Sequence, residues 1–167
     1  MPAEIRFAAA EDAHTIHRFI CDLAEYEREP DAVEATPEGL AAQLRDPRPP
    51  FECLIAEIDG APVGFALFFH NFSTWRGRRG LYLEDLFVSP AARGQGAGLA
   101  LLRALAAVAV ERGCARMEWC VLNWNTPAID FYDALGATPM TDWTTYRLTD
   151  QALSDLAQQG AAPTPQR

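Results

Sequence analysis

The chain has 167 residues, of which 49% are hydrophobic and 22% are charged, a composition typical of one ordinary globular domain rather than a disordered chain. The formal net charge of −9 argues against nucleic acid or an anionic membrane as a partner. All 14 basic residues are arginines, so a Schiff-base lysine and the phosphate-binding lysine of a Walker loop are excluded.

Hydrophobic periodicity and turn signals predict an alternation of strands and helices along the whole chain. Thr36-Pro37 resembles a helix cap, Asp59-Gly60 a tight hairpin turn, and 71–80 a polar, arginine-rich loop. The predicted elements are strands at 4–9, 51–58, 62–70, 81–88, 117–122 and 143–148, and helices at 11–28, 37–45, within 89–113, at 125–134 and at 151–159. This order predicts an α/β fold, with a mixed central β-sheet flanked by helices in a three-layer α/β/α sandwich. We expect a single domain over 1–167, with a flexible tail from about residue 160.

The histidines and cysteines do not form a metal-binding pattern. His14 and His17 stand three residues apart on a predicted helix but lack a carboxylate or cysteine patterned around them, so a solvated helix face is the preferred interpretation. The four cysteines form no C-x-x-C pair, and we expect no histidine neighbour that would activate any of them. We therefore expect no metal and reduced thiols. The acidic N-terminus and the absence of a long apolar run favour a cytoplasmic protein without a membrane partner.

The most informative stretch is the glycine-rich turn that leads into the helix within 89–113. It reads Arg93-Gly94-Gln95-Gly96-Ala97-Gly98. Glycines let the backbone approach a ligand, and the free N–H groups at a helix start attract phosphate. The spacing is neither a dinucleotide-binding fingerprint nor a Walker loop. Taken alone, such a turn is equally compatible with simple packing of a helix on a sheet.

Two sequence blocks together resemble the GNAT acetyltransferase superfamily. The first is this turn after the strand YLEDLFV, and the second is Asn125-Thr126-Pro127-Ala128-Ile129-Asp130-Phe131-Tyr132 followed by Leu135-Gly136-Ala137. The chain is most similar to the diamine acetyltransferase branch, which includes spermidine/spermine and thialysine N-acetyltransferases. The residues that carry this closer likeness are Leu23 to Glu27, Leu81 to Asp85, and Trp124-Asn125.

The resemblance implies an acetyl-CoA site whose parts can be assigned residue by residue. It implies that the main chain of Leu86, Phe87 and Val88 pairs with the pantetheine arm. The pyrophosphate would lie on Arg93, Gly94, Gln95, Gly96, Ala97 and Gly98, and the pantetheine would be flanked by Asn125 and Ala128. The resemblance also implies a homodimer with the last strand near the interface.

The same resemblance implies an amine site and two catalytic groups. Tyr132 would protonate the departing CoA thiolate, and Glu84 would take the proton of the substrate ammonium, directly or through water. Both roles suit the chemistry, because an alkylammonium with a pKa of about 10.4 is mostly protonated at neutral pH. Substrate contacts are implied for Tyr26, Glu27, Trp75, Glu84, Asp85, Glu118 and Trp119.

Several alternatives stay open at this point. Tyr132 beside Phe131 could be a core residue, and Glu84 and Asp85 would face opposite sides of a regular strand unless it is bulged. The loop reads Ser73-Thr74-Trp75 where polyamine enzymes carry an aspartate, which favours a thialysine-type or short amine over a long polyamine. The sequence therefore predicts acetyl transfer from acetyl-CoA to the primary amine of a small cationic molecule: a diamine, a polyamine or a lysine-like amino acid. The alternatives are a protein N-terminal or drug-amine acetyltransferase, or a non-catalytic module that binds acyl-CoA as a regulator.

Overall fold

The computed structural model describes residues 2–165, which form two compact units, one ending at Trp124 and one beginning at Asn125. The first unit contains one mixed sheet in the order β1-β2-β3-β4-β5. Its strands are β1 (Glu4–Phe7), β2 (Glu52–Ile58), β3 (Ala61–Ser73), β4 (Arg78–Val88) and β5 (Met117–Trp119). The pairs β1–β2, β2–β3 and β3–β4 are antiparallel, and β5 is parallel to β4.

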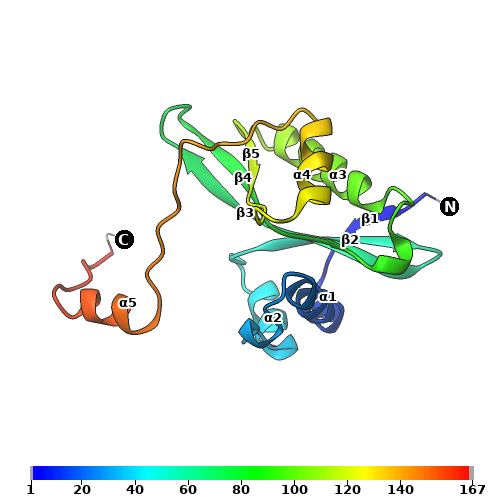
Figure 1. Ribbon diagram of the computed structural model, residues 1–167. Helices are drawn as coiled ribbons and strands as arrows, with labels where there is room; N and C mark the ends of the chain where they lie inside the picture. The colour runs from blue at the N-terminus through cyan, green and yellow to red at the C-terminus, as the bar shows by residue number, and fades with distance from the viewer. Residues whose placement is uncertain (1, 166–167) are drawn as a thin grey trace. The chain divides into compact units, whose positions relative to one another are not determined.

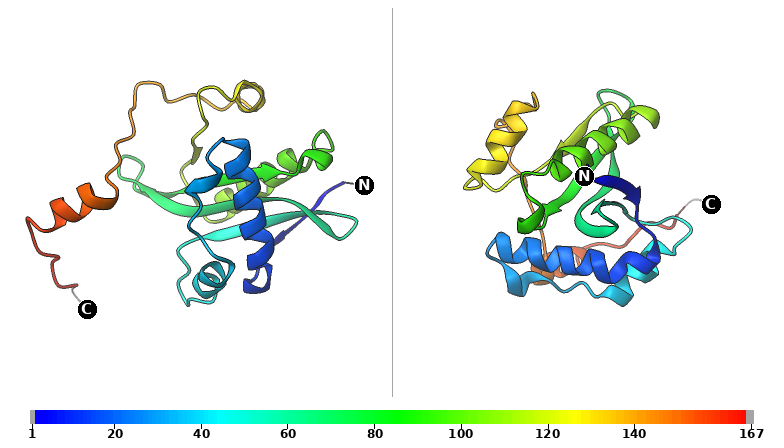
Figure 2. Two further views of the ribbon diagram at one scale, coloured as in Figure 1. Left: turned by 60° about the horizontal axis from the view of Figure 1, so that its bottom comes forward. Right: turned by 90° about the vertical axis from the view of Figure 1, so that its right-hand side faces the viewer.

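Helices cover both faces of this sheet, as expected from the sequence. Helices α1 (Ala13–Tyr26) and α2 (Pro37–Leu44) lie on one face, and α3 (Ala97–Glu111) lies on the other (Figures 1 and 2). The core beneath α1 and α2 is apolar and includes Ile16, Phe19, Leu23, Leu40, Cys53, Phe65, Leu67 and Phe87. The short 3-10 helices are η1 (Ala10–Asp12), η2 (Pro30–Ala32) and η3 (Pro90–Ala92).

Local sequence signals account for the start of one helix and for one hairpin turn. The Thr36 side chain accepts a hydrogen bond of 3.1 Å from the N–H of Gly39, and Pro37 is the first residue of α2. Asp59 and Gly60 both have positive φ, at 51° and 75°, which is the conformation of the tight turn that joins β2 to β3. Both features confirm the sequence prediction.

The β3–β4 hairpin is longer than the sequence suggested. The predicted loop at 71–80 is wrong over most of its length, because β3 continues to Ser73 and β4 already begins at Arg78. Ser73 lies opposite Arg78, and Phe72 opposite Arg79. The pairing of the two backbones stabilises these polar residues as strand, so the connecting turn contains only residues 74–77.

The second unit contains helices α4 (Thr126–Ala134) and α5 (Asp150–Ala157). Both agree with the predicted helices, and Gly136 after α4 has a φ of 82°, as a helix-ending glycine requires. The predicted strand at 143–148 is wrong: within the described residues this segment has no strand neighbour and is neither strand nor helix. β-branched and aromatic residues favour a strand only where a partner strand accepts their hydrogen bonds. Residues 161–165 form no helix or strand, and 166–167 lie outside the described part.

Candidate active site

Strand β4 loses its neighbour on one side halfway along its length. The ladder with β5 includes only Leu81 opposite Met117, Tyr82 opposite Glu118 and Leu83 opposite Trp119. Among the described residues, no strand pairs with the outer edge of β4 from Glu84 to Val88. An open strand edge can form main-chain hydrogen bonds with an extended ligand. Leu86, Phe87 and Val88, the residues expected to pair with the pantetheine arm, lie on this edge.

The turn before α3 has the backbone of an anion-binding loop. Gly94 and Gly96 have φ values of 78° and 83°, and Gly96 is the N-cap of α3. A Cβ built on either glycine would meet no atom within 4 Å, so both face open space. The first N–H groups of a helix have no partner within that helix. This geometry is suited to binding a phosphate group, so Gly94 to Gly98 remain the predicted site of the pyrophosphate.

The two polar side chains of this turn are held by nearby carbonyls. The Arg93 Nε donates to the Val88 carbonyl at 3.1 Å, and the Gln95 Nε2 donates to the Ala91 carbonyl at 3.2 Å. The Arg93 guanidinium also lies 5.1 Å from the ring centre of Tyr26 and 5.8 Å from that of Phe87. Arg93 therefore links the glycine-rich turn, the end of β4 and the end of α1.

A β-bulge in β4 arranges the acidic residues. Leu67 lies opposite Asp85, but the next residue, Phe68, lies opposite Leu83, so Glu84 is the extra residue of the bulge. Leu67 belongs to the core beneath α1, and the paired side chain of Asp85 points to the same face. Asp85 is half-buried, whereas Glu84 is exposed. The condition under which both carboxylates can serve one site, a bulged strand, is met.

The C-terminal end of α1 adds a third carboxylate and an aromatic wall. Glu27, the half-buried C-cap of α1, has its pKa raised by burial. Arg28 follows in the left-handed conformation with a φ of 66°, and its guanidinium lies 4.2 Å from the ring centre of Trp124. The Tyr26 and Trp124 rings are 5.9 Å apart. A strained non-glycine residue held by a cation–π contact fixes the direction in which the chain leaves α1.

Electrostatics join the three carboxylates into one group, which we call the acidic cluster: Glu27, Glu84 and Asp85. Burial, followed by the charges of Glu84 and Glu27, raises the pKa of Asp85 to about 6. A concentration of negative charge beside an open strand edge is suited to binding an alkylammonium.

Tyr82 lies near the acidic cluster in β4 and is not among the predicted site residues. Its hydroxyl is 3.1 Å from the Cys120 Sγ, and its ring is 5.2 Å from that of Phe69. The hydrogen bond with Cys120, burial and the nearby charges of Glu84 and Glu118 raise the pKa of Tyr82, so its hydroxyl stays protonated. Its position two residues before Glu84 in the strand was the available sequence signal. Only the bulge and the strand register show on which face of the sheet Tyr82 lies.

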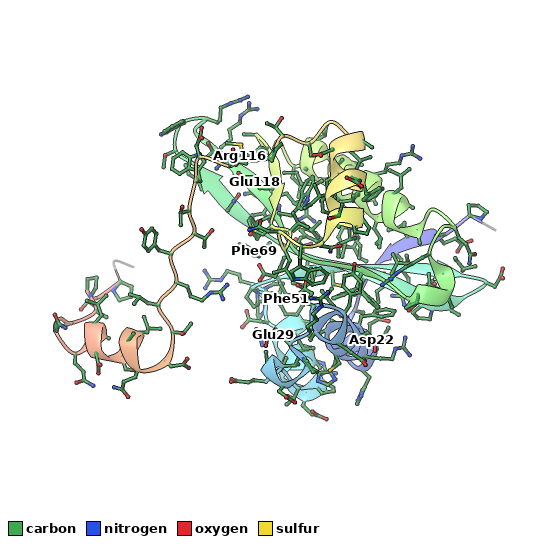
Figure 3. All side chains as sticks on the ribbon, viewed as in Figure 1. Asp22, Glu29, Phe51, Phe69, Arg116 and Glu118 are labelled. Atoms are coloured by element: carbon green, nitrogen blue, oxygen red, sulfur yellow. The ribbon has the colours of Figure 1, made fainter. Side chains whose placement is uncertain are left out.

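Glu118 is held by a polar network near the hairpin rather than by the acidic cluster. The Arg116 Nε donates to the Glu118 Oε1 at 2.7 Å, and the Asn71 Nδ2 donates to the same atom at 3.5 Å. The Arg116 Nη1 also donates to the hydroxyl of Ser73, which is only 2% exposed. In the view of Figure 3, Phe69 lies between the Arg116–Glu118 pair and α1. Trp119, the next residue of β5, points to the opposite face of the sheet.

Trp75 lies at the hairpin end of the sheet, away from the acidic cluster. It occupies the turn of the β3–β4 hairpin and is 86% exposed. The six residue steps of β3 from Leu67, opposite Asp85, to Ser73 span about 20 Å. Within its own unit, the structure therefore does not bring Trp75 to the acidic cluster.

The remaining predicted residues belong to the second unit. Asn125 is the N-cap of α4, and Ala128 and Tyr132 follow at helical spacing. Positions separated by three, four and seven residues lie on one face of a helix, so these three residues share a face of α4. The helix begins with Pro127 near its first turn, which explains why this block is helical.

The expectation that no cysteine has a histidine neighbour is wrong. The Cys21 Sγ lies 3.8 Å from the Nε2 of His17, one helical turn earlier on α1. That Nε2 also lies 2.9 Å from the Ala35 carbonyl, to which it can donate. Cys21, Cys53, Cys114 and Cys120 are all free. Across residues 2–165 there is no group of three or more potential metal ligands, and no helix is long and apolar enough to cross a membrane.

Comparison with known proteins agrees with this geometry. The profile of the acetyltransferase (GNAT) family matches residues 14–137. A thialysine N-epsilon-acetyltransferase from Bos taurus is 40% identical over 164 residues, covering 92% of this chain and 96% of that protein. An L-ornithine N5-acetyltransferase from Arabidopsis thaliana is 31% identical, covering 93% of this chain and 88% of that protein.

A solved structure supports the same fold. An integron cassette protein from the mobile metagenome of V. cholerae superposes with a TM-score of 0.79 at 28% sequence identity. The match covers 95% of this chain and 99% of that one. The matched range includes residues of both compact units.

Proposed function

The chain belongs to the GNAT acetyltransferase family, and from this premise we propose that it acetylates the primary amine of a small, lysine-like cationic molecule. Acetyl-CoA is the acetyl donor that this family uses. The matched relatives act on thialysine and L-ornithine, which both carry an alkylamine on an amino-acid backbone. The family membership sets aside the alternative of a non-catalytic binding module.

The observation that carries the choice of substrate is the acidic cluster at the bulge of β4. Glu84 and Asp85 from β4, with Glu27 from α1, concentrate negative charge where β4 parts from β5. Such a site lowers the free energy of a bound ammonium and disfavours a substrate whose groups near the amine are negative.

We also propose roles for the residues that the family resemblance assigned. The open edge Leu86 to Val88, the turn Arg93 to Gly98, and Asn125 and Ala128 of α4 would hold acetyl-CoA. Tyr132 would donate the proton that the CoA thiolate takes up. Tyr26 would form a wall of the amine site, whereas Glu118, held by Arg116, would contribute through its charge and not as a base.

The test is a panel of amines assayed for CoA thiol release. We expect thialysine, lysine and ornithine to show a higher kcat/KM than spermine, because the loop at 73–75 adds no further carboxylate to anchor a second distant ammonium. Nα-acetyl-lysine methyl ester has only its side-chain amine free, so its turnover distinguishes acetylation of the side-chain amine from acetylation of the α-amine. A preference for spermine, or for a protein N-terminus, would overturn this choice of substrate.

We further propose that the enzyme is a cytoplasmic homodimer that needs no metal. Tyr146 and Leu148, in the segment 143–148 that has no strand partner, are 93% and 51% exposed, and a partner subunit would cover such side chains. Sedimentation equilibrium of the full chain tests whether it is a dimer. Activity assays with and without a chelator test whether the enzyme needs a metal.

A further inference from the structure

The bulge gives its two carboxylates unequal surroundings. Glu84, the extra residue, is exposed to solvent. Asp85 faces the α1 side of the sheet opposite Leu67 and is half-buried. A carboxylate in water keeps an ordinary affinity for protons, whereas one that has lost water binds a proton more tightly.

The charged groups that face Asp85 are all acidic. Glu84 comes from its own strand and Glu27 from the end of α1. The Cys53 thiol, from β2, interacts with Asp85 as well, and burial raises the pKa of that thiol so that it stays neutral. Among the ion pairs of residues 2–165, none includes Asp85. Asp85 therefore lacks the cation that would normally compensate a half-buried carboxylate.

This arrangement suits Asp85 to bind both a cation and a proton. An incoming ammonium supplies the missing positive charge, and burial with like-charged neighbours brings the pKa of Asp85 to about 6. At neutral pH such a group is mostly ionised, yet it accepts a proton more readily than an exposed glutamate does, as efficient general bases require.

Resting on the proposed acetyltransferase function, we propose that Asp85, and not Glu84, is the carboxylate that removes the proton from the substrate ammonium. An N–H bond of the ammonium breaks, an O–H bond forms on Asp85, and the freed electron pair attacks the acetyl carbonyl. The C–N bond forms and the C–S bond breaks; Tyr132 protonates the thiolate, and the nitrogen's surplus proton restores Tyr132. Asp85 returns its proton to solvent. Glu84 and Glu27 attract the cation and tune Asp85.

The first test is the pH dependence of kcat/KM with the preferred amine. Asp85→Asn is expected to lower kcat/KM at pH 7 by about 10²–10⁴-fold and to regain activity toward the pKa of the amine, where the free base is abundant. Glu84→Gln is expected to keep the acid limb of the profile but to move it to lower pH, because a neighbouring negative charge is lost. Asp46→Asn, an exposed position after α2, is the matched control.

The opposite pattern, an acid limb lost in Glu84→Gln and kept in Asp85→Asn, would overturn the proposal in favour of Glu84. If neither variant moves the acid limb, the limb reports the titration of the substrate amine, and the proposal for Asp85 is also overturned. Absence of turnover with every amine would contradict the proposed function itself.

The second test needs no substrate. Carbon-13 NMR of protein labelled at aspartate carboxyls is expected to show one signal that titrates near pH 6, is missing in Asp85→Asn and titrates at lower pH in Glu84→Gln. If no aspartate signal titrates above pH 5, the proton-accepting role of Asp85 fails even where the enzyme acetylates amines as proposed.

Discussion

The guanidinium of Arg93 lies 5.1 Å from the ring centre of Tyr26, so the turn before α3 meets the last residue of α1. Arg93 belongs to the loop proposed to hold the pyrophosphate, and Tyr26 precedes Glu27 of the acidic cluster. The contact couples the proposed pyrophosphate loop to the proposed amine site. A substitution of either residue should therefore change the binding of both substrates.

Tyr26→Leu is expected to weaken acetyl-CoA binding by about 2–5-fold, the value of one exposed cation–π contact. Tyr26→Phe keeps the aromatic face and should bind acetyl-CoA as the wild type does. Isothermal titration calorimetry of both variants measures the difference. Equal affinity in the leucine and phenylalanine variants would show that the ring of Tyr26 does not support Arg93.

Gly96→Val is expected to reduce acetyl-CoA affinity by at least about 10-fold, because its side chain would project into the open space before α3 and strain a φ of 83°. Gly60→Val is the matched control. It has a φ of 75° and equally open surroundings, but lies in the β2–β3 turn. Both variants should lose about 1–2 kcal/mol of unfolding free energy, and only Gly96→Val should lose affinity. Similar affinity losses in both would indicate general destabilisation.

Tyr132→Phe is expected to lower kcat by about 10²–10⁴-fold with little change in acetyl-CoA affinity, because the ring is kept and only the proton donor is lost. Steady-state kinetics and calorimetry on the same variant separate the two effects. Asp133→Asn, at an exposed residue of the same helix, provides the control and should be active. Near-normal turnover in Tyr132→Phe would make Tyr132 a packing residue.

Asp85→Asn is expected to stabilise the fold at neutral pH while it impairs catalysis. The pKa of Asp85 is raised to about 6 by burial and by Glu84 and Glu27, above that of an unfolded aspartate. The native state therefore holds the proton more tightly than the unfolded state. The contribution of protonated Asp85 to the free energy of unfolding is complete below pH 4 and is lost as pH rises through about 6.

Removing the charge should consequently raise the unfolding free energy by about 1–3 kcal/mol at pH 7.5 and by much less at pH 4. Urea denaturation of wild type and Asp85→Asn at the two pH values measures this difference. A gain of the same size at both pH values would show that the stabilisation does not come from ionisation.

Most elements of the fold could be predicted because their signals are local. Thr36 and Pro37 begin α2, Asp59 and Gly60 form the hairpin turn, and the glycines after Arg93 precede α3, each as expected. The errors fall where pairing with a distant segment decides. Residues 78–80 are strand because β3 is their partner, and 143–148 is not strand because the described chain offers no partner.

The sequence by itself determined the glycine-rich turn, the Asn125–Tyr132 helix and the presence of adjacent acids in β4. These depend on backbone conformations and residue types that each segment carries alone. Only the tertiary structure decided that Glu84 is the bulged residue, that Asp85 faces α1 beside Glu27, and that β5 leaves β4 after Leu83. Register and strand divergence are set by hydrogen bonds and packing between segments far apart in the chain, where a one-residue shift reverses which side chains face the site.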